Sequence, residues 1–110
     1  QPSNEAPIVK LTIPAQIYTV GDYVTIIPDD YFSDPQSDNL TYTVKFNGDP
    51  NTEVDWTSFS TSAFDDSYLA YTSATITAKD TSNNQVELTF DLTVNAFVFD
   101  ANVDYIQGAV

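Results

Sequence analysis

The 110-residue sequence contains no cysteine, no histidine and no arginine. The absence of cysteine excludes disulfide bonds as a source of stability. Because histidine is absent as well, nucleophilic catalysis by the usual Ser–His or Cys–His pairs is excluded, and we expect that the protein is not an enzyme. No apolar run approaches the length of a membrane-spanning helix, so we expect no membrane insertion of this segment.

Positive charge is also scarce, because three lysines oppose 16 acidic residues and the formal net charge is -13. Nucleic acid is excluded as a partner, since neutralising its phosphates requires lysine and arginine. Anionic membrane surfaces are disfavoured for the same reason. Divalent cations or basic partners suit such a field better. Most of the acids are aspartates, which favour turns.

The composition favours a single domain rich in strands. Apolar residues make up 42% of the chain, chiefly Val, Ile, Leu, Phe and Tyr, and threonine is abundant, as is typical of β-sheets. No signal peptide is visible and Gln1 is not an initiator, so we expect a processed protein or a fragment of a larger one.

Apolar and polar residues alternate with a period of two, which is typical of half-buried strands. The expected strands are residues 9–13, 17–20, 23–27, 40–46, 54–60, 74–78 and 86–94. They predict an all-β, seven-stranded antiparallel Greek-key sandwich, closed by a hairpin over residues 74–94. The core residues expected from this alternation are Leu40, Tyr42, Val44, Ile76, Leu88, Phe90 and Leu92.

The predicted organisation has three parts. Residues 1–7 form an N-terminal lead or linker, residues 8–95 form the sandwich, and residues 96–110 form an apolar tail. The run that begins Asn47-Gly48 is a strong turn signal between two of the strands.

One ordered set of motifs resembles a known family. The set comprises Phe32, Asp34, Asp38, Leu40 and Tyr42, then Trp56, then Ala78 and Asp80, and finally Phe90 and Val94. Over residues 5–95 this pattern resembles the dystroglycan-type cadherin-like family, a relative of cadherin and immunoglobulin-like repeats. Two features depart from the family: Gln36 stands where an acid is usual, and residues 64–73 lack its Gly-Thr-Pro stretch.

The resemblance implies an extracellular or cell-surface location. It also implies neighbouring repeats or identical subunits as partners, with other surface proteins or glycans as further ligands. We therefore expect an adhesive or spacer module, rigidified by calcium. Two alternatives stay open: a structural subunit of a surface filament, and a carbohydrate-binding module.

Acidic residues gather at one predicted end of the sandwich. Because successive strands reverse direction, Glu5, Asp34, Asp38 and Asp80 are expected to share one pole. Calcium requires six to eight oxygen ligands, largely carboxylates and carbonyls, so these four residues form a candidate metal site. The competing interpretation is that Asp34 and Asp80 accept hydrogen bonds from nearby backbone amides and stabilise turns.

Three further features bear on function. Asn39-Leu40-Thr41 fits the acceptor pattern for N-glycosylation at Asn39. Trp56 is expected to be a core residue and not a platform for a sugar. In the tail, Phe97, Phe99, Tyr105 and Ile106 are candidate assembly residues. The tail could be a linker, the first strand of a following repeat, an edge strand of its own domain or a strand donated to a neighbour.

Overall fold

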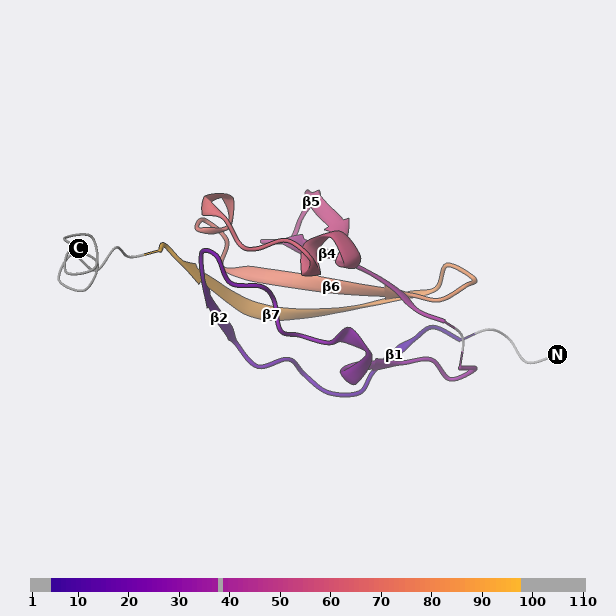
Figure 1. Ribbon diagram of the computed structural model, residues 1–110. Helices are drawn as coiled ribbons and strands as arrows, with labels where there is room; N and C mark the ends of the chain where they lie inside the picture. The colour runs from indigo at the N-terminus through magenta and orange to yellow at the C-terminus, as the bar shows by residue number, and fades with distance from the viewer. Residues whose placement is uncertain (1–4, 38, 98–110) are drawn as a thin grey trace, which may run out of the picture.

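The computed structural model describes residues 5–37 and 39–97 (Figure 1). Strands dominate the described residues. They are β1 (Ile8–Val9), β2 (Gln16–Thr19), β3 (Phe32–Ser33), β4 (Thr41–Phe46), β5 (Asp49–Asp55), β6 (Ser73–Lys79) and β7 (Gln85–Asn95). The helical elements are short: η1 (Pro28–Asp30), α1 (Trp56–Ser60) and η2 (Asp66–Tyr68). The all-β class predicted from the sequence is therefore confirmed.

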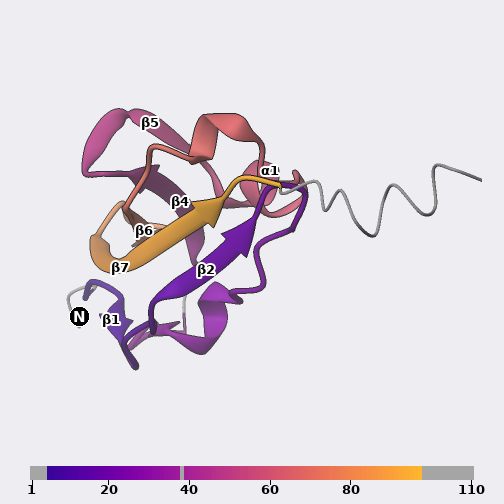
Figure 2. The same cartoon turned by 90° about the vertical axis from the view of Figure 1, so that its left-hand side faces the viewer.

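The strands form two sheets of unequal size. The larger sheet has the order β2-β7-β6-β4-β5, and the smaller one pairs β1 with β3. One prediction was wrong in part, because β2 and β7 run parallel, as Figure 2 shows, while the other ladders are antiparallel. The chain reaches β2 from β1, at the end of the fold where β7 begins, so β2 and β7 both run toward the other end (Figure 1).

The most strongly alternating segments form the strands that the sequence predicts. β4, β6 and β7 pair in register, with Val44 opposite Ile76 and Ile76 opposite Leu88. Asn47 and Gly48 close the β4–β5 hairpin with positive φ angles of 54° and 71°, which a type I′ turn requires. Among the predicted core residues, Val44, Ile76, Phe90 and Leu92 are buried. Leu40, Tyr42 and Leu88 are partly buried and pack against the core.

Three predicted strands differ in the structure. Residues 9–13 contribute only Val9 to β1, and Leu11 is 60% exposed, because the chain leaves β3 after the hydrogen bond from Lys10 N to Tyr31 O. Residues 23–27 are not assigned to a strand, although their burial alternates: Val24 and Ile26 are more buried than their neighbours.

The predicted strand at residues 54–60 is instead the end of β5 followed by helix α1. Trp56 and Phe59 are three residues apart, so one helical turn places both on the same face. Both side chains are buried, which a strand would prevent because residues three apart lie on opposite faces.

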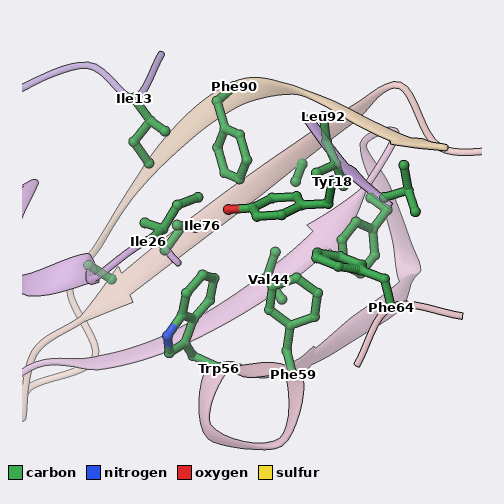
Figure 3. Close-up of a cluster of buried hydrophobic side chains, with 14 of the residues drawn as sticks. Ile13, Tyr18, Ile26, Val44, Trp56, Phe59, Phe64, Ile76, Phe90 and Leu92 are labelled. Carbon is green, nitrogen blue, oxygen red and sulfur yellow. The ribbon is translucent and has the colours of Figure 1, made fainter. Parts of the chain in front are cut away.

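Aromatic rings fill the space beneath the large sheet (Figure 3). Tyr18 stacks on Phe64 with ring centroids 4.8 Å apart, and Trp56 contacts Phe59 at 5.1 Å. Figure 3 shows Trp56 and Phe59 pointing from α1 toward Val44. Trp56 is therefore a core residue, as predicted.

Strand β7 provides a direct test of this core. Phe90 is 5% exposed, so Phe90→Ala should lower the free energy of unfolding by about 3–5 kcal/mol. Phe97→Ala is a matched control, because Phe97 is 68% exposed and its loss should cost less than about 0.5 kcal/mol. Urea denaturation of the two variants measures both values, and equal losses would show that the inward phase of β7 is wrong.

Candidate functional site

Three of the residues predicted to bind calcium, Glu5, Asp34 and Asp80, come from segments at one end of the fold, which we call the acidic pole. Thr41 of β4 pairs with Lys79 of β6, and Lys79 pairs with Gln85 of β7, so the β6–β7 turn lies beside the start of β4. Figure 1 shows the N-terminal segment, the β3–β4 connection and the β6–β7 turn together at the right-hand end. Strand β7 ends at the opposite end.

Asp80 organises the β6–β7 turn. Its side chain is 4% exposed, and its Oδ1 accepts hydrogen bonds from the backbone N–H groups of Ser82 at 2.8 Å and Asn84 at 2.9 Å. Asn84 Nδ2 also donates to Oδ2 at 3.3 Å. These bonds compensate for burying the carboxylate, so the turn-stabilising role expected as the second interpretation is present.

Asp34 has a similar role in the β3–β4 connection. Its Oδ2 accepts a hydrogen bond from the N–H of Gln36 at 2.9 Å. The side-chain Oε1 of Gln36 in turn accepts from the backbone N–H of Glu5 at 3.1 Å. Gln36, the residue that departs from the family pattern, thus ties the N-terminal segment to this connection, a contact that a carboxylate could also make.

Tyr42 and Asp29 form a pair that the sequence did not predict. The Tyr42 hydroxyl donates to Asp29 Oδ1 at 2.6 Å. Burial raises the pKa of Tyr42 above its ordinary value, and the hydrogen bond to Asp29 and the charge of that carboxylate raise it further. The strand period placed the Tyr42 ring toward the core, but no sequence signal indicates which group its hydroxyl meets.

An open depression of about 400 Å³ lies at the acidic pole. It is lined by Asp29, Phe32, Ser33, Asp34, Asn39 and Leu40. Two acidic residues and one asparagine therefore line the same hollow. Asn39, the predicted glycosylation acceptor, is exposed to solvent there, as an acceptor must be.

The predicted metal set is only partly within the described structure. Glu5, Asp34 and Asp80 are described, and Asp38 lies outside the described residues. Within residues 5–37 and 39–97, no three acidic side chains are close enough together to hold a metal ion. The calcium site therefore stays a prediction.

A second polar surface covers the outer face of the large sheet. A depression of about 400 Å³ is lined there by Thr41, Tyr42, Thr43, Glu53, Asp55, Thr77, Lys79 and Gln85. Nearby, Lys45 forms an ion pair with Glu87 at 3.1 Å, and Thr75 and Thr89 share a hydrogen bond of 2.9 Å. Threonines and paired charges give this face a hydrophilic character.

Of the candidate assembly residues, Phe97 follows β7 at the other end of the fold. Phe97 is described and exposed, whereas Phe99, Tyr105 and Ile106 lie outside the described residues. No helix among the residues that the structure describes is long and apolar enough to cross a membrane.

Comparison with known proteins does not identify a relative. A scan against protein-family models finds no model that matches the chain, and a search of curated proteins finds no match. The resemblance to the dystroglycan-type cadherin-like family thus rests on the motifs of the sequence.

The raised pKa of Tyr42 predicts a loss of stability at alkaline pH. The folded chain holds the Tyr42 proton more tightly than the unfolded chain, so this stabilisation is complete below the unfolded pKa of about 10 and is lost as the pH rises above it. Tyr42→Phe should flatten the decline of unfolding free energy above about pH 10. Part of the slope should remain, because burial and the charge of Asp65 also raise the pKa of Tyr68. Urea titrations across this range would contradict the assignment if wild type and variant declined equally.

Proposed function

We propose that the protein is an extracellular spacer or adhesive module of a cell-surface protein, built on a Greek-key sandwich of the cadherin and immunoglobulin-like type. One observation carries the proposal: the described chain starts at the acidic pole and leaves at the opposite end of the fold (Figure 1). A module attached at opposite ends separates its neighbours by its own length.

The dimensions of the sheet suit this role. β7 has 11 residues and runs from the acidic pole to the exit of the described chain. At about 3.3 Å for each residue, such a strand spans about 36 Å. β7 pairs with β6, and β6 also pairs with β4 on its other side, so β7 belongs to a stiff sheet.

One edge of the large sheet also suits a module that must not aggregate with other copies of itself. Edge strands promote unwanted pairing unless they carry charges or irregularities. β5, at one edge, exposes Asp49, Glu53 and Asp55, and its pairing with β4 shifts register between Val44 and Phe46. These features discourage aggregation through that edge.

Calcium binding at the acidic pole is part of the proposal. Asp34 and Asp80 come from segments at the same end, and the hollow lined by Asp29, Asp34 and Asn39 offers oxygen ligands. A cation there would neutralise part of the net charge of -13 and stiffen the joint to a preceding domain.

Thermal unfolding tests the calcium part of the proposal. A ligand that binds only the folded state raises the melting temperature by mass action, so millimolar calcium should raise it relative to chelator. The readout is this calcium-dependent shift, which Asp34→Ala and Asp80→Ala should each abolish. Asp91→Ala, an exposed acid on β7, should keep it. A wild-type melting temperature that is equal in both buffers would refute calcium binding by the single domain.

A structural subunit of a filament is the second candidate, favoured by an unused backbone edge. Residues 23–27 alternate in burial as a strand does. In the part of the chain that the structure describes, residues 5–37 and 39–97, the N–H group of Thr25 donates to the Tyr18 hydroxyl at 3.1 Å, and the other N–H groups of this segment have no hydrogen-bond partner. Such an edge accepts a strand from another chain. In the sequence of the tail, Phe97 and Phe99 are two positions apart, and so are Val103 and Tyr105, as a donated strand needs. The carbohydrate-binding alternative stays a prediction, and a glycan array tests it.

Scattering from one and two copies distinguishes spacer from filament subunit. Two copies joined in tandem should have a maximum dimension at least about 35 Å greater than one copy, since each adds the length of one long strand. Two copies packed side by side would contradict the spacer function. If single copies associate and removal of residues 96–110 abolishes the association, the filament candidate replaces it.

A further inference from the structure

The β4–β5 turn contains an asparagine followed by glycine, in a chemically sensitive arrangement. Asn47 and Gly48 both have positive φ angles, and Phe46 pairs with Asp49 across the turn. A Cβ placed on Gly48 would meet no atom within 4 Å, so the backbone here is open to water. The turn requires the two positive φ angles, but it does not require the contacts that the Asn47 side chain makes.

That side chain holds a distant loop, residues 70–73. Asn47 Oδ1 accepts hydrogen bonds from the backbone N–H of Thr72 at 2.8 Å, the N–H of Ser73 at 3.2 Å and the Thr72 hydroxyl at 3.3 Å. Asn47 Nδ2 donates to the carbonyl of Ala70 at 3.5 Å. The backbone N–H of Asn47 also donates to Ser73 O at 3.0 Å. Both ends of the carboxamide are thus engaged with this loop.

An asparagine followed by glycine can lose its side-chain amide without an enzyme. The backbone nitrogen of Gly48 attacks Cγ of Asn47, a C–N bond forms, and the side-chain nitrogen leaves as ammonia. The resulting five-membered imide then adds one water at either carbonyl, which yields aspartate or isoaspartate. The attacking nitrogen is least hindered when it belongs to glycine, because glycine has no Cβ.

The folded geometry opposes the first step. To reach the Gly48 nitrogen, the Asn47 carboxamide must turn away from residues 70–73 and lose its hydrogen bonds to them. The loop is itself held by Tyr71, whose ring stacks on Phe46 with centroids 4.7 Å apart. We propose that Asn47 is a site of spontaneous deamidation. In the folded domain the loop of residues 70–73 prevents the reaction, and the reaction proceeds when this loop separates from the β4–β5 turn.

The two products differ in their consequences. Aspartate keeps an acceptor oxygen for the N–H groups of Thr72 and Ser73 but no longer donates to the Ala70 carbonyl. Isoaspartate adds one carbon to the main chain before Gly48, so Phe46 and Asp49 no longer face each other across a two-residue turn. Either product adds one negative charge, and isoaspartate makes the opening irreversible.

Peptide mapping by mass spectrometry tests the proposal on the unaltered chain. At mildly alkaline pH, the amide-to-acid mass change at Asn47 should accumulate at least about tenfold faster in urea than in buffer, because reaction from an open state follows its population. Asn51, Asn83 and Asn84 in the same digest serve as internal references, since none precedes glycine. Equal rates at Asn47 in buffer and in urea would overturn the proposal.

Two substitutions, one in the loop and one beside it, test whether the loop controls the reaction. Tyr71→Ala removes the stacking on Phe46 and should speed the reaction in buffer several-fold while leaving the rate in urea unchanged. Leu69→Ala alters an exposed side chain of the neighbouring segment and should leave both rates unchanged. Circular dichroism in the same buffer verifies that both variants are folded. An unchanged rate in folded Tyr71→Ala would overturn the role of the loop.

Discussion

Ile76, at the middle of β6, is fully buried, and the position of β6 between β4 and β7 places most of the other elements. Every residue from 74 to 78 is buried, so both faces of this strand are covered. On the inner face Ile76 meets the aromatic core, and on the outer face Thr75 shares a hydrogen bond with Thr89. The direction of β6 also carries Asp80 to the acidic pole.

The layer opposite the large sheet has few ladder hydrogen bonds and depends on side chains instead. β1 and β3 pair over two residues each, while helix α1 contributes Trp56 and Phe59 to the core. Aromatic burial substitutes here for strand pairing, since each ring removes a large area from water. Among the described residues, 23–27 keep backbone N–H groups without a hydrogen-bond partner, and the filament candidate depends on these groups. The proposed spacer function depends instead on the long strands of the other sheet.

The period-two alternation of apolar and polar residues indicates which side chains are buried, and burial is what the sequence predicted best. Strands β4, β6 and β7 were predicted correctly because their alternation matches the register in which they pair. The Asn47-Gly48 turn was predicted because few other residues adopt its φ angles. Residues 23–27 alternate in burial as predicted, yet alternation does not reveal whether a partner strand is adjacent. Helix α1 is too short for a helical period to be visible. At the acidic pole, strand direction placed Asp34 and Asp80 at one end, but the Tyr42–Asp29 bond depends on the conformation of η1.

The proposed spacer function requires that the protein is a stiff unit joined to its neighbours at opposite ends. Because the chain has no cysteine, Ala6→Cys and Ala96→Cys, at two exposed positions, allow spin labels to be attached there alone. Pulsed electron paramagnetic resonance then measures the distance between the labels. The account predicts one narrow distribution centred above about 30 Å, close to the span of β7. A mean below about 20 Å, or a broad distribution, would contradict it.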